Sequence, residues 1–384
     1  MKKRFLNISL IFLVGLITTV FIKSCKEPYD PAVKYSGAHY LVVEGYINSN
    51  GVPTNIKLSR TRSISKGDTA SYINETGAQV IIEDDQNNSY PLYEIGGGNY
   101  GASYNLDSSN RYRLRITTAD NKQYLSDFVA CKESPPIDNL GWKLNGDGVQ
   151  VFVNTHDPSN RTNFYRWDYT ETWEFHSEYN SDVQYNPDTS VTPRLSQVYI
   201  CYQTHEANNI LLGSSEKLNE HVIHEAPLTL IPDHDRRLSV LYSTLVTQYA
   251  LDSNAYNYWN AMKGNTENVG SIFGTQPNQG TGNIHCLSDT TEPVIGYIGV
   301  GSTQQARFFI SNASMPADWN QNGNCDYIEV PKIKDSIYLF FGEQGFVPIK
   351  EHLNGIIVLG YYASEGPCVD CTLNGTTEKP SFWP

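Results

Sequence analysis

Short runs of alternating polar and apolar residues, separated by turn residues, recur along the first part of this sequence. In residues 111–117, Tyr112, Leu114 and Ile116 alternate with polar side chains. A period of two places the apolar side chains on one face, which predicts a half-buried β-strand. Segments rich in β-branched and aromatic residues predict further strands at residues 40–47, 55–58, 78–83, 90–94 and 122–129. Several short strands between residues 39 and 134 predict an immunoglobulin-like β-sandwich.

Two prolines, Pro135 and Pro136, close this domain because neither can extend a strand ladder. A larger β-rich domain is expected over residues 137–384. Its predicted strands lie at residues 148–153, 164–175, 197–203, 228–231, 238–251, 308–310, 337–341 and 355–362. One short helix is expected near residues 253–263, where apolar residues recur at helical spacing between Asp252, which can cap a helix, and Gly264, which can end one. The sequence therefore predicts an all-β chain that carries a single short helix.

The only long apolar segment, residues 8–22, lies near the start of the chain. Basic residues precede it and the small Ser24 follows it, which is the pattern of a secretory signal peptide over residues 1–24. Because Cys25 comes next, the segment resembles the lipobox of bacterial lipoproteins, in which the cysteine thiol is diacylated and becomes the new N-terminus. Lys23 departs from that box, where a small or apolar residue is usual. The alternative is an uncleaved membrane anchor, for which about 15 apolar residues are short of the roughly 20 that span a bilayer.

Lipidation of Cys25 would attach the protein to outer-membrane lipid, with residues 25–38 as a polar tether. Lys26, Glu27 and Asp30 follow the cysteine and resemble the signal that sends lipoproteins to the outer face of the outer membrane. We therefore expect a lipid-anchored protein that faces the cell exterior. The alternative is that these residues belong only to a polar tether.

Acidic residues outnumber basic ones, 41 to 28, which gives a formal net charge of −13 at pH 7. Binding to nucleic acid, or electrostatic adhesion to anionic lipid, needs clustered lysine and arginine. The composition therefore argues against a nucleic-acid partner, and an acidic surface is consistent with solubility.

Six cysteines remain after Cys25, an even number that suggests disulfides in an exported protein. Cys368 and Cys371 could instead form a redox or metal-binding pair, but no second pair of this spacing completes a zinc site. One of these two is expected to join Cys325, because they lie in the same region. The disulfide candidates are Cys131, Cys201, Cys286, Cys325, Cys368 and Cys371.

Residues 318–329 fit the pattern of a calcium-binding loop at every required position. Oxygen ligands suit Ca²⁺, and Gly323 allows the sharp turn that such a loop needs. Proline-bearing flanks are not EF-hand helices, so the alternative is a turn that is pinned by a disulfide at Cys325. Calcium is the only cofactor that the sequence suggests, with an affinity in the range of extracellular modules, roughly 10⁻⁴–10⁻³ M. The candidate ligands are Asp318, Asn320, Asn322, Asn324, Asp326 and Glu329.

The sequence contains no motif for a nucleophile elbow, a Walker loop or a zinc protease, so no catalytic residue is predicted. Asp233 and Asp235 would share one face of an extended chain, and we expect them to be solvated residues of a turn. Among the 26 tyrosines and 6 tryptophans, Trp167, Tyr169 and Trp173 share one face of a predicted strand. Such a row is either a stacking platform for sugars or peptides or part of a sandwich core, and we expect core.

Short segments occur in a characteristic order along the chain: LVVEG at 41–45, LSR at 58–60, GAQV at 77–80, NFYRW at 163–167, YNYW at 256–259, GNI at 282–284, GY at 296–297, CVDC at 368–371 and KPSFW at 379–383. In this order they resemble an uncharacterised family of outer-membrane lipoproteins, the domain of unknown function 4249 family. Members of that family tend to be encoded beside TonB-dependent receptors. The resemblance therefore implies a TonB-dependent outer-membrane receptor as the partner, and it implies no catalytic residues.

Together these observations predict a non-catalytic cell-surface lipoprotein that serves as an accessory ligand-capture or docking subunit of a TonB-dependent transporter. The first alternative is a structural or adhesive surface lipoprotein without a transport partner. The second is an extracellular hydrolase, for which Asp233 and Asp235 would be the residues to replace.

Overall fold

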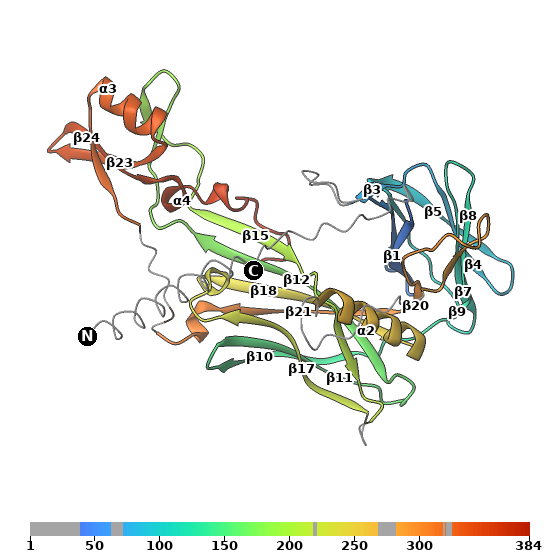
Figure 1. Ribbon diagram of the computed structural model, residues 1–384. Coiled ribbons are helices and arrows are strands. Elements are labelled where there is room, and N and C mark those ends of the chain that lie inside the picture. Colours follow the sequence, from blue (N-terminus) through green and yellow to red (C-terminus); the bar gives the residue numbers. More distant parts are fainter. Residues whose placement is uncertain (1–38, 63–71, 218–220, 268–281, 318, 320–324) are drawn as a thin grey trace, which may run out of the picture. The chain divides into compact units, whose positions relative to one another are not determined.

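The computed structural model describes residues 39–62, 72–217, 221–267, 282–317, 319 and 325–384 (Figure 1). The predicted signal peptide 1–24, the tether 25–38 and Cys25 therefore lie outside the described residues. The described residues from Tyr40 onward belong to one unit. Within the described residues, no helix has the length and apolar character needed to cross a membrane.

The N-terminal part is a set of short strands, as the alternating pattern predicts. The strand order is β19-β8-β7-β4-β5-β6-β2-β1-β20, with β3 beside β2 and β9 beside β7. The strands of this part are β1 (Leu41–Asn48), β2 (Thr54–Thr61), β3 (Tyr72–Asn74), β4 (Gln79–Asp84), β5 (Ser89–Gly96), β6 (Asn99–Ala102), β7 (Arg111–Thr117), β8 (Gln123–Ser126), β9 (Val129–Ala130), β19 (Ile284–Cys286) and β20 (Gly299–Gly301).

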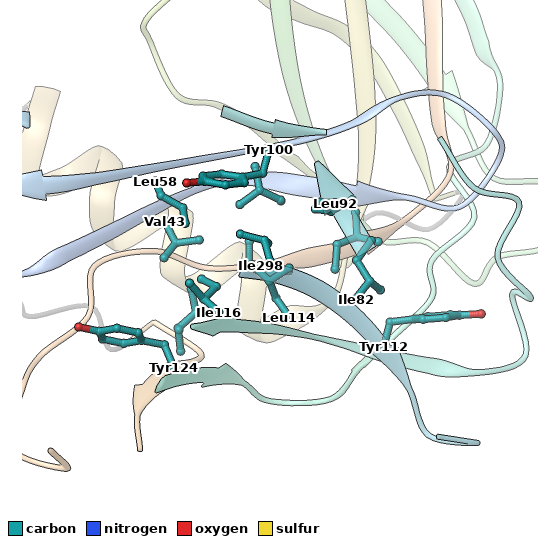
Figure 2. Close-up of a cluster of buried hydrophobic side chains, with 14 of the residues drawn as sticks. Val43, Leu58, Ile82, Leu92, Tyr100, Tyr112, Leu114, Ile116, Tyr124 and Ile298 are labelled. Carbon is teal, nitrogen blue, oxygen red and sulfur yellow. The ribbon is translucent and has the colours of Figure 1, made fainter. Parts of the chain in front are cut away.

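The apolar core of this part is formed by every second residue of its strands, as in β7. Tyr112, Leu114 and Ile116 of β7 are fully buried, and they lie between polar neighbours that face outward. In the register of β4 against β7, Ile82 is opposite Leu114 and Val80 is opposite Ile116. Figure 2 shows Ile82, Leu114 and Ile116 close to side chains of the other strands in one apolar cluster.

Two strands from much later in the sequence complete this part. β20 pairs in parallel with β1, and β19 pairs with β8; in Figure 1 the orange β20 lies beside the blue β1. Ile298 and Val300 contribute to the same apolar cluster. The boundaries expected from the sequence assign β19 and β20 to the second domain, whereas the structure places these two strands in the N-terminal sheet. A pairing across so many residues leaves no local pattern in the sequence.

The next part contains two sheets around a second core. One sheet has the order β10-β11-β17, and the other β15-β12-β18-β21 with β16 beside β12. Trp167, Tyr169 and Trp173 of β12 are buried in this core, so the strand row is core, as expected. The strands are β10 (Ile137–Asn145), β11 (Gly148–His156), β12 (Phe164–His176), β15 (Ile200–Glu206), β16 (Leu211–Ser214), β17 (Val222–Pro232), β18 (Leu241–Leu251) and β21 (Thr303–Ser311), with the 3₁₀ turns η1 (Arg236–Leu238) and η2 (Asn312–Ser314).

The expected helix is α2 (Ser253–Glu267). The Asp252 carboxylate accepts a hydrogen bond from the Ala255 amide at 2.7 Å, which caps the first turn. Ala255 and Tyr258 are buried, so the predicted apolar face is the packed one. The helix runs past Gly264, because a single glycine weakens a helix by only about 1 kcal/mol.

The C-terminal part holds a small sheet of order β22-β24-β23, beside the hairpin β13-β14. Its elements are β13 (Val183–Tyr185), β14 (Val191–Pro193), β22 (Ile328–Pro331), α3 (Lys334–Ile337), the π-helical turn η3 (Tyr338–Glu343), β23 (Phe346–Asn354), β24 (Ile357–Glu365), α4 (Gly366–Val369) and the 3₁₀ turn η4 (Cys371–Leu373).

The strand predicted at residues 337–341 is wrong, because this segment is helical in α3 and η3. Ile337 and Phe341 are four residues apart and are both buried in the small core, which is the spacing of one helical face. A short apolar run does not distinguish a strand from a buried helix. The all-β class itself is confirmed, since most described residues outside loops lie in strands.

Candidate functional site

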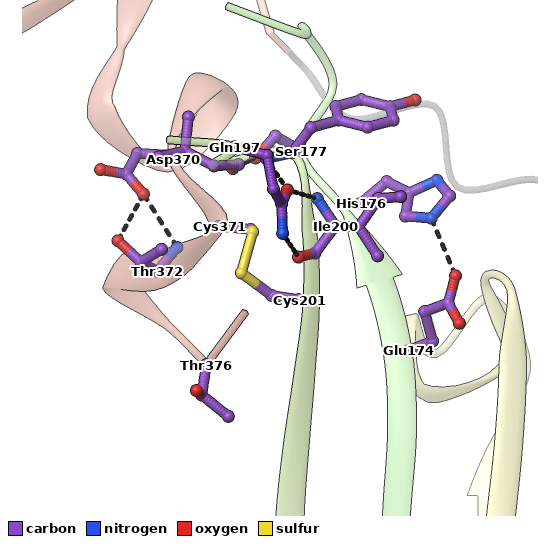
Figure 3. Close-up of a disulfide and its surroundings, with 12 residues drawn as sticks. Glu174, His176, Ser177, Gln197, Ile200, Cys201, Asp370, Cys371, Thr372 and Thr376 are labelled. Carbon is purple, nitrogen blue, oxygen red and sulfur yellow. Dashed lines mark hydrogen bonds and ion pairs between the residues drawn. A yellow bond between two sulfur atoms is a disulfide. The ribbon is translucent and has the colours of Figure 1, made fainter. Parts of the chain in front are cut away.

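Two disulfides organise the C-terminal part. Cys325 joins Cys368, and Cys201 of β15 joins Cys371 (Figure 3). The expectation that Cys325 pairs with one of the two C-terminal cysteines is therefore confirmed. Since Cys368 and Cys371 belong to different bridges, they do not form a redox or metal-binding pair.

The disulfide expectation is wrong for the two other candidates, because Cys131 and Cys286 are free. Cys286 is buried on β19 in the N-terminal core, and Cys131 is half-buried at its edge. Burial raises the pKa of the Cys131 thiol. The even number of cysteines suggested that all six form disulfides, but these two do not. Both thiols instead pack as small apolar groups.

The Cys325–Cys368 bridge holds the residues around Tyr179. The Tyr179 hydroxyl donates a hydrogen bond to the Cys325 carbonyl at 2.6 Å, and its amide donates to the Cys368 carbonyl at 3.0 Å. Further along, the Asp182 amide donates to the Ile349 carbonyl of β23 at 2.7 Å. Residues 178–182 are thus pinned to neighbouring chain segments at both ends.

A cavity of about 500 Å³ lies between this pinned segment and the small sheet. Its volume is within the range of ligand pockets, roughly 300–1,000 Å³. We call it the tyrosine pocket. It is lined by Glu178, Tyr179, Asn180, Asp182, Tyr327, Ile349, Lys350 and Tyr362.

Three tyrosine rings from distant parts of the chain form one wall of the tyrosine pocket. The ring of Tyr327 is 6.2 Å from that of Tyr179 and 5.4 Å from that of Tyr362, nearly perpendicular to both. Edge-to-face contacts of this kind stabilise aromatic pairs by about 0.5–1.5 kcal/mol. Tyr327 is nevertheless 58% exposed, so its ring is supported by its neighbours and open to a ligand.

Two side chains already pack against the ring of Tyr362. The Lys350 ammonium lies 5.6 Å from the centre of this ring, and the centre of the His352 imidazole lies 5.0 Å from it, with the two ring planes tilted by 34°. Both residues come from β23, and Tyr362 is the cross-strand partner of Lys350. The ring of Tyr362 is therefore occupied by groups of the chain itself.

The pocket contains charges of both signs. Glu178 and Asp182 supply two carboxylates, and Lys350 supplies one ammonium group. Desolvation raises the pKa of the Tyr179 hydroxyl, and the charges of Glu178 and Asp326 raise it further. Hydrogen-bond donors and acceptors therefore surround an aromatic wall, an arrangement that suits reversible binding of a small polar molecule.

The predicted calcium loop, residues 318–329, includes Tyr327, which lines the tyrosine pocket. Asp318, Asn320, Asn322 and Asn324 lie outside the described residues. Asp326 is exposed, and the carboxylate of Glu329 pairs with the His352 imidazole at 3.4 Å. Among the described residues, no three His, Cys, Asp or Glu side chains are placed to hold a metal ion together. The calcium interpretation stays a prediction.

The two aspartates considered for hydrolysis have different environments. Asp233 is exposed after β17, whereas Asp235 accepts a hydrogen bond from the Arg237 amide and caps η1. Burial would raise the pKa of Asp235, but hydrogen bonds from Arg237 lower it overall. Arg237 also contacts the buried Glu171 at 3.0 Å. Asp235 is thus part of a structural ion network.

A second cavity, of about 480 Å³, is lined by residues 131–136 and by the segment around Asp157. Both oxygens of Asp157 accept hydrogen bonds from the amides of Ser159, Arg161 and Thr162. These bonds outweigh desolvation and lower the pKa of Asp157 to about 2. Because the carboxylate oxygens of Asp157 already accept hydrogen bonds within their own turn, this cavity has fewer polar groups available to a ligand than the tyrosine pocket has.

Sequence reasoning did not find the tyrosine pocket. Tyr179, Tyr327 and Tyr362 come from three segments that are distant in the sequence, and nothing in their local patterns connects them. The abundance of tyrosine suggested a recognition surface, but the row on β12 that carried this idea is core. One sequence feature that pointed to this region was the disulfide predicted at Cys325, whose carbonyl accepts the hydrogen bond from Tyr179.

Comparison with known proteins identifies a family but no activity. The model of a family described as "Domain of unknown function (DUF4249)" matches residues 26–307. No curated protein matches the chain. One similar solved structure, a Y1175G mutant of Salmonella alpha-2-macroglobulin, has 10% sequence identity and a TM-score of 0.18. The match covers 77% of this chain and only 15% of that much longer one, and at this TM-score it supports no argument about fold or function.

Proposed function

We propose that this chain, which belongs to the domain of unknown function 4249 family, is a cell-surface lipoprotein that captures a ligand in its tyrosine pocket. In this proposal it acts beside a TonB-dependent receptor of the outer membrane and does no chemistry on the ligand. The observation that carries the proposal is the exposed ring of Tyr327, supported by two further tyrosines and surrounded by polar groups.

Surface attachment is supported by the start of the sequence. An apolar segment, Ser24 and then Cys25 have the pattern of a lipoprotein signal, and two acyl chains anchor a protein where one does not. The disulfides are consistent with an oxidising environment outside the cytoplasm. Metabolic labelling with a fatty-acid analogue should mark the wild-type protein and leave Cys25→Ala unmarked.

Ligand capture is supported by the way the pocket is held. Tyr179 and Asp182 are fixed by backbone hydrogen bonds to Cys368 and Ile349, so the binding surface exists before a ligand arrives. A preformed surface loses little conformational entropy on binding, which favours affinity.

The receptor part of the proposal is tested by gentle co-purification of the full lipidated chain. We expect an outer-membrane receptor to accompany the wild-type protein from detergent-solubilised membranes, and a Tyr327→Ala variant to retain it, because the pocket is proposed for the ligand. Isolation of the protein alone would contradict an accessory role. It would favour the alternative, a structural or adhesive surface lipoprotein.

Orientation is tested on intact cells. A protein that faces the exterior is cleaved by added protease, whereas one that faces the periplasm is protected. Protection of the wild-type chain, with cleavage after the outer membrane is opened, would overturn capture at the cell surface.

A further inference from the structure

We infer that the tyrosine pocket binds a neutral, polyhydroxylated ligand, namely a short oligosaccharide. This inference rests on the proposed ligand-capture function and names the class of ligand for the same pocket. Three observations support it: the backbone of Tyr327 is fixed, charged side chains line the pocket, and Lys350 already packs against the ring of Tyr362.

Tyr327 is exposed but its backbone is fixed. Cys325, two residues earlier, is held in a disulfide, and the Asp326 carbonyl accepts a hydrogen bond from the Ser364 hydroxyl at 2.6 Å. One residue later, Ile328 enters β22 in register with Ala363 of β24. An aromatic side chain on such a backbone provides contact area at a low entropic cost.

The accessible ring of Tyr327 suits a ligand with a flat apolar face. Its ring is almost perpendicular to those of Tyr179 and Tyr362, so its neighbours fix its orientation. A pyranose ring presents C–H groups on its face and hydroxyl groups at its rim. Stacking on Tyr327 would bury that apolar face and leave the hydroxyls at the pocket's polar groups.

The polar groups match hydroxyls better than ions. Glu178 and Asp182 accept hydrogen bonds only, and the Lys350 ammonium donates only. A hydroxyl group both donates and accepts, so one ligand can satisfy all three. The Asn180 amide, which also lines the pocket, can do either.

Ligands of either charge are disfavoured. An anion would lie close to two carboxylates, Glu178 and Asp182, in a protein of net charge −13. An organic cation would be repelled by the Lys350 ammonium, which already lies 5.6 Å from the centre of the Tyr362 ring. The remaining class is a neutral ligand with many hydroxyls.

The test is calorimetric titration of the folded protein with three sets of probes. The first set contains neutral gluco-, manno- and xylo-oligosaccharides with α and β linkages. The second is choline, a cation, and the third is an oligogalacturonate, an anion. We expect saturable binding of at least one neutral oligosaccharide, with choline and oligogalacturonate bound more weakly or not at all.

Variants place the binding at the pocket. Tyr327→Ala is expected to weaken the oligosaccharide affinity about tenfold, because it removes a central aromatic contact. Tyr327→Phe keeps the ring and should bind nearly as the wild type does. The control is Tyr93→Ala on β5, since Tyr93 is 65% exposed and is part of the N-terminal sandwich; it should change nothing.

The inference is overturned if none of the neutral oligosaccharides binds at millimolar concentration, or if choline or oligogalacturonate binds more tightly. It is also overturned if Tyr327→Ala and Tyr93→Ala bind the oligosaccharide equally well. The proposed function fails in a different way, because it depends on receptor co-purification and surface exposure, which these titrations do not measure.

Discussion

The Tyr179 hydroxyl donates a hydrogen bond to the carbonyl oxygen of Cys325, 2.6 Å away, although 146 residues separate the two in sequence. Cys325 is itself bonded to Cys368, and the Cys368 carbonyl accepts from the Tyr179 amide. Tyr179 therefore bridges both halves of one disulfide. The bridge therefore fixes the position of a residue that lines the tyrosine pocket.

Removal of this disulfide should therefore weaken both stability and binding. For Cys325→Ser combined with Cys368→Ser, we expect a loss of about 2–4 kcal/mol in the free energy of unfolding, since the bridge closes a long loop. The oligosaccharide affinity should fall as well, because Tyr179 and Tyr327 lose a fixed neighbour. Denaturant unfolding and calorimetric titration measure the two effects.

The matched control for this variant is Cys131→Ser, which changes a half-buried cysteine that forms no disulfide. It should leave the affinity unchanged and lower stability much less. Equal stability of the double variant and the wild type would show that the bridge does not constrain the unfolded chain as we expect.

Much of the fold could be predicted because local patterns determine it. Residues 111–117 form β7 within the predicted bounds, since the alternation there is complete. The helix after Asp252 was predictable from its cap and its apolar face. Residues 337–341 were not, because Ile337 and Phe341 fit a strand and a helix equally well until the packing of η3 is known.

The site could not be predicted, because its parts are brought together only by tertiary structure. Tyr327 directly precedes β22, and Tyr362 is in β24. These two strands pair with each other, but no single turn connects them, since β23 lies between them in the sequence. Likewise, β20 pairs with β1, so residues 299–301 belong to the N-terminal sheet, although the sequence predicted them to be part of the second domain. Local periodicity predicts the elements well, but it carries no information on which elements become neighbours.

The low pKa of Asp157 makes stability depend on pH in the acid range. Its folded-state pKa is about 2, below the value of about 3.9 for an unperturbed aspartate, because amides of its own turn donate to it. The stabilisation is therefore fully present above about pH 4 and is lost as the pH falls toward about 2. Replacement by Asp157→Asn should flatten the decline of unfolding free energy between these two pH values.

Asp188 provides the comparison for Asp157. Its carboxylate accepts from Ser190 in a similar turn, but the residue is exposed. These hydrogen bonds also lower the pKa of Asp188, but solvent weakens them at an exposed site, so Asp188→Asn is expected to change the acid dependence much less than Asp157→Asn does. If both variants follow the wild-type curve, the turn at Asp157 does not contribute to acid stability.

The C-terminal tail should be essential for the stability of the five-stranded sheet. Trp383 is 7% exposed, and its ring packs against Tyr202 of β15 and Phe309 of β21. Its indole N–H donates to the carboxylate of Glu174 on β12 at 2.9 Å, so one side chain joins three strands. Trp383→Ala should cost about 3–5 kcal/mol in unfolding free energy, as measured by urea denaturation followed by circular dichroism. Leu373→Ala, at a C-terminal position that is 60% exposed, should change it by less than about 0.5 kcal/mol, and similar values for the two variants would refute a structural role for the tail.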